Sequence, residues 1–422
     1  MNKKLIAAAV SAAVVAPVAS QADMTVYGRV NNAIDLNGLS VDNPVTAADE
    51  GASLTDVSNV SSRFGLKGNA DIGNGLTAHG QYEFATVTDK EQPGIADIRV
   101  ATVGVSGAFG RIDIGNQWSA YFNTFGTLVS PTYSLGYYLY SSVGGGPFRG
   151  SNTIKYSNSF GPLSAQLDIR LNDDKKLGSS IENNDNAEKI RGDGWGLGLS
   201  FAVNDNITIA AAYDEDQRPD GSAITDIALT ADDVANDGVV ARFDNSGGDA
   251  DDVTEATVDR DETRMGIAVK ANFGSYWVSA GWQNREVDNS RDISLSGFTN
   301  LEDSDATTVL ADRTSVDGAI LENLSDDIDT TFIYGGGSLG EKTSWLFGYS
   351  QADDDGSIPT WTDNDDVVHV YTGERDNSTQ LTWGVYHNLG GGLKLYYEAT
   401  DVDSENTAKD GARHLLGMRV DF

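Results

Sequence analysis

The ten residues from Arg264 read RMGIAVKANF, and this stretch decides the fold class of the chain. Apolar Met265, Ile267 and Val269 occupy every second position, whereas Arg264 and Lys270 occupy positions of the opposite parity. Successive side chains of a β-strand point to opposite faces, so this period of two predicts a strand with one apolar and one polar face. Helical periodicity is nearly absent from the rest of the chain after residue 23.

The same alternation recurs up to the C-terminus and predicts sixteen strands. They cover residues 24–36, 60–70, 76–87, 95–107, 110–117, 151–159, 162–172, 194–203, 206–216, 262–273, 275–286, 329–339, 342–352, 376–388, 392–403 and 413–422. Short turns alternate with long polar segments between these strands, as in outer-membrane barrels, whereas a soluble β-sandwich does not account for such unequal connections. Roughly sixteen to eighteen strands enclose an aqueous channel. We therefore predict an all-β fold, a 16-stranded antiparallel transmembrane β-barrel.

The N-terminal residues have the pattern of a secretory signal peptide. Two lysines precede an apolar run over residues 5–19, and the sequence SQA at residues 20–22 fits a cleavage site. The run is shorter than the roughly 20 residues that a membrane-spanning helix needs. We therefore expect residues 1–22 to be a signal peptide and residues 23–422 to form one barrel domain in the outer membrane.

The chain is strongly acidic, with a formal net charge of −34 at pH 7, and this argues against nucleic acid as a partner. Much of the negative charge lies in three long predicted external loops, residues 220–262, 288–329 and 353–376. Three interpretations stay open: a cation reservoir at the channel mouth, loosely bound calcium or magnesium that bridges to lipopolysaccharide phosphates, and a merely solvated surface. Acidic fragments such as residues 249–252 lack the spacing of a calcium-binding loop, so we assign no metal site and no cofactor.

Several motifs resemble those of the Gram-negative general diffusion porins. The matching stretches are YGR at residues 27–29, SSRFGLKG at 61–68, LTAHGQYEF at 76–84 and FGRIDIG at 109–115, together with the terminal Phe422 that such barrels present for assembly. Their order along the chain makes a chance match improbable. The resemblance implies a homotrimer of barrels in contact with outer-membrane lipid and lipopolysaccharide, each with a third loop that folds inward and narrows the channel.

In that family, basic side chains on neighbouring strands form a ladder on the lumen wall, opposite the third loop. By motif position the resemblance places five residues on the ladder: Arg29, Arg63, Lys67, Arg99 and Arg149. Each also lies on the polar parity of its predicted strand. The alternative for any one of them is a solvated side chain on the lumen wall that plays no part in selectivity.

The third loop, residues 117–150, departs from the family pattern because it contains no Asp or Glu. The family usually places carboxylates there, facing the ladder. This loop instead carries many aromatic residues, among them Trp118, Tyr121, Tyr133, Tyr137, Tyr138 and Phe148. They either pack the loop against the wall, which we favour, or present faces along which a sugar ring slides. In both cases a basic ladder without opposing loop carboxylates predicts a narrow region that is neutral or favours anions.

No catalytic constellation is evident. The chain has four histidines, His79, His369, His387 and His414, and none lies in a nucleophile or zinc motif. We therefore predict a channel for passive diffusion of ions and small hydrophilic solutes and not an enzyme. The alternatives are a substrate-selective saccharide channel and an acidic surface β-protein that binds cations.

Overall fold

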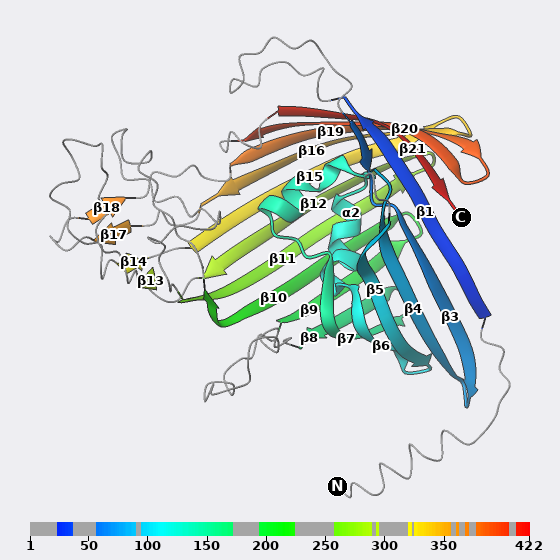
Figure 1. Cartoon of the computed structure of the whole chain (residues 1–422), viewed down its shortest axis with the longest axis horizontal. Coiled ribbons are helices and arrows are strands. Elements are labelled where there is room, and N and C mark those ends of the chain that lie inside the picture. Colours follow the sequence, from blue (N-terminus) through cyan, green and yellow to red (C-terminus); the bar gives the residue numbers. More distant parts are fainter. Residues whose placement is uncertain are drawn as a thin grey trace, which may run out of the picture.

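The computed structural model describes residues 23–36, 56–89, 94–171, 194–223, 257–288, 293–294, 320–322, 325–355, 360–362, 368–370, 377–404 and 411–422. Within these ranges, sixteen antiparallel strands form one closed barrel. The predicted signal peptide and most of the three acidic loops lie outside the described residues. Figure 1 shows the strands side by side, with the helical turns of the third loop inside the ring.

The barrel strands follow the chain order. They are β1 (Asp23–Asp35), β3 (Arg63–Gly73), β4 (Leu76–Val87), β5 (Gly94–Gly107), β6 (Gly110–Trp118), β7 (Arg149–Phe160), β8 (Leu163–Arg170), β9 (Gly194–Asn204), β10 (Ile207–Ala223), β11 (Thr257–Phe273), β12 (Tyr276–Asp288), β15 (Ser325–Leu339), β16 (Thr343–Asp354), β19 (Ser378–Gly390), β20 (Leu393–Ser404) and β21 (Gly411–Asp421). The short strand β2 (Asp56–Asn59) pairs with β1. Four short strands form a separate sheet: β13 (Ile293–Ser294), β14 (Ile320–Glu322), β17 (Thr360–Thr362) and β18 (Val368–Val370).

The first strand closes the ring, because β1 pairs with β3 on one side and with β21 on the other. Phe422 extends this seam. Its backbone N–H donates to the carbonyl of Gly28 at 3.1 Å, and the N–H of Gly28 donates to the carbonyl of Phe422 at 2.9 Å. Closure gives the backbone groups of the first and last strands partners, which a spanning sheet requires in lipid.

The apolar faces of the strands point outward, as the alternation predicts. Met265 and Ile267 of β11 are 47% and 55% exposed, whereas Arg264 of the same strand is 6% exposed. This arrangement is the reverse of a water-soluble protein, and it suits a barrel whose outer surface contacts lipid and whose interior is polar. No helix among the described residues is long and apolar enough to cross a membrane.

All sixteen predicted strands are confirmed, and the main differences are at their external ends. β10 continues to Ala223 and β11 begins at Thr257, so both strands run into the segment predicted as a loop over residues 220–262. Backbone pairing in a hairpin does not need apolar side chains, so strands continue beyond the apolar belt into polar sequence. The apolar pattern marks where lipid contact ends and not where pairing ends.

The third loop contains short helical turns that the sequence pattern did not predict. They are the π-helical turns Phe122–Gly126 and Tyr138–Val143, α2 (Thr127–Val129) and the 3-10 turn Leu135–Tyr137. Each has at most six residues, which is too few for an amphipathic period to become visible.

Candidate channel constriction

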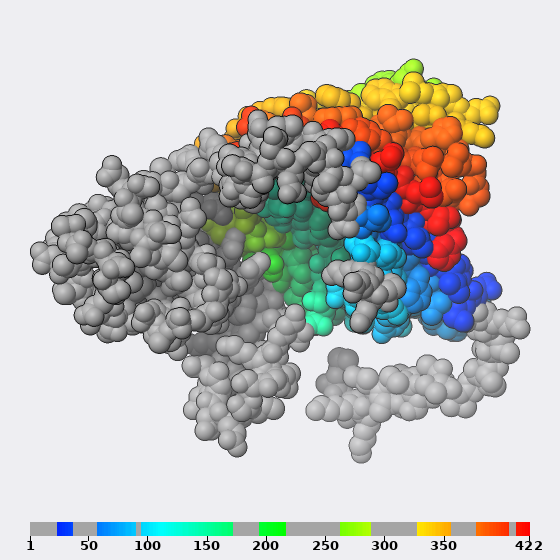
Figure 2. Space-filling model, turned by 45° about the horizontal axis from the view of Figure 1, so that its top comes forward, coloured from blue at the N-terminus to red at the C-terminus, as the bar shows by residue number. Residues whose placement is uncertain are grey.

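The third loop lies against the inner wall and forms the main buried core of the molecule. Tyr121, Phe125 and Tyr140 of the loop are 0% exposed, and they cluster with wall residues that include Phe332 and Tyr334 of β15. The ring of Phe125 meets that of Phe332 edge-on at 6.2 Å. In Figure 2 the coloured surface is hollowed between the first strands of the barrel (blue) and the strands from the middle of the chain (green). Part of the third loop (teal) lies recessed in this hollow.

The other predicted aromatics of the loop also make packing contacts. Trp118 stacks on Phe122 with ring centroids 4.8 Å apart, and Tyr137 meets Phe148 edge-on at 5.6 Å. Tyr133 packs against Tyr386 and Tyr396 of the wall, and Tyr138 packs against the buried cluster. These contacts correspond to the packing interpretation of the aromatic loop.

Small residues of the wall make room for the loop. Gly198 of β9, Ala212 of β10 and Gly266 of β11 are paired neighbours across three strands. A Cβ at Gly198 would collide with Thr124 of the loop, and one at Gly266 would lie 2.9 Å from Phe125. The loop therefore fits a depression in the wall where side chains are small or missing.

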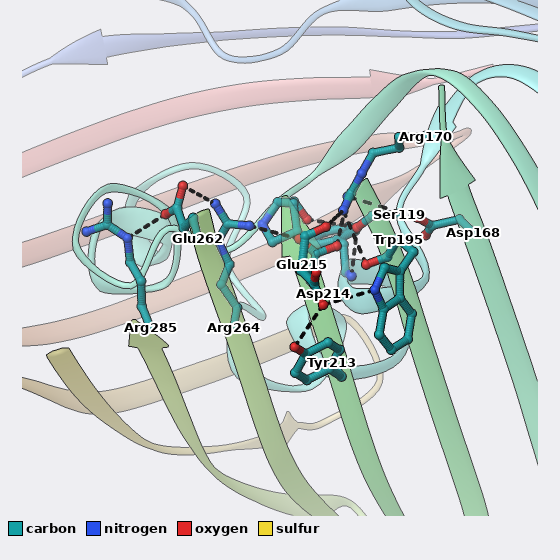
Figure 3. Close-up of polar contacts among 12 residues, drawn as sticks. Ser119, Asp168, Arg170, Trp195, Tyr213, Asp214, Glu215, Glu262, Arg264 and Arg285 are labelled. Carbon is teal, nitrogen blue, oxygen red and sulfur yellow. Dashed lines mark hydrogen bonds and ion pairs between the residues drawn. The ribbon is translucent and has the colours of Figure 1, made fainter. Parts of the chain in front are cut away.

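A row of alternating acidic and basic side chains crosses the wall beside the loop (Figure 3) and consists of Asp168 and Arg170 of β8, Asp214 of β10, Glu262 and Arg264 of β11, and Arg285 of β12. We call it the charge row. Asp214 accepts hydrogen bonds from Arg170 at 2.7 Å and from Arg264 at 2.8 Å. Glu262 pairs with Arg264 and with Arg285, each at 2.6 Å. Buried carboxylates need such partners, because an unpaired buried charge is strongly destabilising.

Both ends of the charge row bind the loop backbone. Asp168 accepts a hydrogen bond from the N–H of Ala120 at 2.5 Å, where the loop begins. Arg285 donates to the carbonyl of Val143 at 3.3 Å, near the end of the loop, and Gln283 donates to the carbonyl of Gly144. The wall thus fixes the two ends of the loop through separate contacts.

A single wall carboxylate fixes the tip of the loop. Glu398 of β20 is 0% exposed, and it accepts hydrogen bonds from the backbone N–H groups of Tyr133 at 2.5 Å, Ser134 at 2.9 Å and Leu135 at 3.3 Å. The hydroxyl of Tyr386 donates to it at 2.6 Å. The loop contains no Asp or Glu. The wall therefore supplies the carboxylate, and the loop supplies the backbone N–H donors.

The predicted basic residues lie on the strands facing the loop. Arg29 is on β1, Arg63 and Lys67 are on β3, Arg99 is on β5 and Arg149 begins β7. Arg99 and Arg149 both lie over the ring of Trp118, at 5.8 and 5.0 Å from its centroid. Lys67 lies over Tyr27 at 5.4 Å. We call these five residues the basic band.

The third loop places no carboxylate opposite the basic band, but the wall itself supplies two carboxylates beside these basic side chains. Glu83 of β4 lies 2.8 Å from Arg99 and 3.8 Å from Arg63. Asp421 of β21 pairs with Arg29 at 2.9 Å. Like charges on neighbouring strands repel, and these acids reduce that repulsion.

The structure adds further residues to the site that motif position alone did not identify. Asp421 also binds Arg419 at 2.8 Å and Lys394 at 3.6 Å, and Arg419 lies 4.3 Å from the ring centroid of Tyr133. Their parity on the last strands was a usable signal, since Arg419 alternates with apolar Met418 and Val420. Together with the basic band these two cations make seven positive side chains, which share the carboxylates of Glu83 and Asp421, so this group of nine side chains has a formal net charge of +5.

A positively charged wall segment and an uncharged aromatic loop thus face each other within a closed ring. A family model described as Gram-negative porin matches residues 7–407. Outer membrane protein F of Serratia marcescens is 25% identical over 226 residues, which is 52% of this chain and 58% of that protein. The chain therefore matches less than two thirds of the length of this relative.

Two solved structures share the fold. The trimer form of OmpT from Vibrio cholerae has a TM-score of 0.56 at 13% identity, covering 95% of this chain and 99% of that one. An anion-selective porin from Comamonas acidovorans also has a TM-score of 0.56, at 15% identity, covering 95% of this chain and 100% of that one.

Proposed function

This chain belongs to the Gram-negative porin family, and from that premise we propose that it forms a water-filled channel through the outer membrane for passive diffusion of ions and small hydrophilic solutes. The observation that carries the proposal is the reversed polarity of the barrel. Apolar side chains such as Ile267 are exposed on its outside, whereas charged side chains such as Arg264 are enclosed. Charges on an inner wall are tolerated where water or passing ions solvate them.

The wall and the loop favour anions in the narrow region. The group of nine side chains around the basic band, with its formal charge of +5, faces a loop without Asp or Glu. An ion that passes between them experiences the positive field with no opposing carboxylate from the loop. The wall carboxylates Glu83 and Asp421 moderate this preference, so we expect weak rather than strict anion selectivity.

Three further elements belong to this proposal. Assembly as a homotrimer is supported by the trimer form of the structurally similar OmpT. Contact with outer-membrane lipid and lipopolysaccharide is supported by the exposed apolar belt. Loosely bound calcium or magnesium would belong to the acidic external loops, most of which lie outside the described residues. We assign no catalytic residue, and the channel needs no cofactor.

Single-channel recording in planar bilayers tests the proposal. We expect a large ohmic conductance, a reversal potential on the anion side in a KCl gradient, and no block by neutral sugars at micromolar concentration. A tight block by one oligosaccharide would instead identify a saccharide-selective channel. Absence of any conductance would contradict the channel function.

A further inference from the structure

A cavity of about 270 Å³ lies in the barrel beside the start of the third loop. Its lining comes from the inner faces of β4 to β8, with Trp118 and Asn123 on the loop side. Arg111 and Ser157, which are paired neighbours, mark its end near the short turn between β5 and β6. The cavity therefore lies on the short-turn side of the loop, and Trp118 separates it from Arg99 and Arg149 of the basic band.

The carboxylate in the lining, Asp113, is already occupied. Arg111 donates to both of its oxygens, at 2.6 and 2.9 Å, and Nε2 of His79 lies 2.7 Å from Oδ1. Asp113 itself is 3% exposed. It therefore offers little negative charge to a solute in the cavity, although it holds Arg111 in place.

Lys155 gives the lining its net positive charge, because the charges of Arg111 and Asp113 cancel formally. Its Nζ donates to the backbone carbonyl of Trp118 at 2.8 Å. An ammonium group has three donors, so one contact leaves two for a ligand. Among the described residues, no carboxylate lies within ion-pair distance of this Nζ. The remaining lining is rich in hydroxyl and amide groups from Gln81, Thr102, Ser157 and Gln166.

We propose that this cavity binds compact oxyanions that carry hydroxyl groups, of the sugar-acid type, after they pass the basic band. Arg111 and Lys155 would hold the anionic group, and the hydroxyl and amide side chains would hold the hydroxyls. Nine water molecules at about 30 Å³ each would roughly fill the space, so a six-carbon solute fits. This inference rests on the proposed channel function and names a solute class for it.

Gluconate is a suitable probe, with glucose as the uncharged control of similar size. Each is added to the short-turn side of channels in a planar bilayer, and the excess current noise and partial block are measured against concentration. Gluconate is expected to produce a saturable effect, whereas glucose at the same concentration produces none. The variants are Lys155→Gln and Arg111→Gln, and each should raise the half-blocking concentration of gluconate about tenfold, as loss of one charge-assisted contact implies.

Lys270→Gln is the matched control, because Lys270 also lies on the inner parity of the wall but on β11, over Trp277 at 5.0 Å. It should leave the half-blocking concentration unchanged. Since Lys155 also contacts the loop, Arg111→Gln is the independent test. The inference is overturned if the half-blocking concentration of gluconate is the same for both cavity variants as for the wild type. It is also overturned if Lys270→Gln raises that concentration as much as the cavity variants do. A wild-type chain without conductance would refute the channel, whereas conductance without a saturable gluconate effect would refute only the binding site.

Discussion

Replacing Glu83 with Gln should make the channel more anion-selective. Glu83 is 6% exposed, and its carboxylate lies between Arg63 and Arg99, which it approaches to 3.8 and 2.8 Å. The substitution keeps the size of the side chain and removes one negative charge from the wall. It raises the formal charge of the group of nine side chains around the basic band from +5 to +6.

The size of the effect follows from Coulomb's law. For an ion that passes at about 6 Å in water, one unit charge contributes about 0.7 kcal/mol, and screening at about 0.1 M salt leaves about 0.4 kcal/mol. The change acts with opposite sign on chloride and potassium, so their relative permeability changes by about 0.8 kcal/mol. This corresponds to a threefold to fourfold increase in the ratio of chloride to potassium permeability, with about 0.6 kcal/mol as the thermal energy.

The assay is the reversal potential across a planar bilayer in a KCl gradient around 0.1 M. Glu286→Gln serves as the control, because it removes the same charge from an exposed side chain on the outward parity near the external end of β12. At about 1 M salt the difference should nearly vanish, since the screening length falls to about 3 Å. An unchanged reversal potential for Glu83→Gln, or one that equals the shift of the control, would show that ions do not pass near Glu83.

The other predictions concern the basic band, the charge row and the buried loop. Replacing Arg63, Arg99 and Arg149 with Ser should move the reversal potential toward cation preference, and an unchanged potential would remove them from the constriction. Asp214→Asn should lower the free energy of unfolding by about 3–5 kcal/mol, because two buried arginines lose a shared carboxylate; the urea midpoint of the purified barrel measures this, and a midpoint equal to the wild type would contradict it. Burial raises the pKa of Tyr140 well above 10, so its contribution to stability is complete below about pH 10 and is lost as the pH rises further. Tyrosinate absorbance should show Tyr140 ionising only together with unfolding, and a variant Tyr140→Phe should lose that component.

The strands and the faces of their side chains could be predicted because both depend on neighbours along the chain. Alternation around Met265 is a local property, and the parity of Arg63 and Arg99 follows from it. Motif position then placed the basic residues, and the structure puts them on strands that face the loop.

The partners of these residues could not be predicted, because they depend on pairing between strands. A bulge at Glu83 shifts the register between β4 and β5, next to Arg99. Glu398 and Tyr133 are 265 residues apart in the sequence. The loop turns are too short for periodicity, and the depression at Gly198 and Gly266 becomes visible only when three strands lie side by side.

The contacts that hold the third loop also determine when it can take up its position during folding. Its start binds Asp168 on β8, its end binds Arg285 on β12, and its tip binds Glu398 on β20. Contacts at such long sequence separation form late, because the intervening chain must first be ordered. The strand that holds the tip, β20, is the last but one strand in the chain. Until β20 has paired, the loop tip lacks the carboxylate that holds it, so the narrow passage is complete only once β20 is in place.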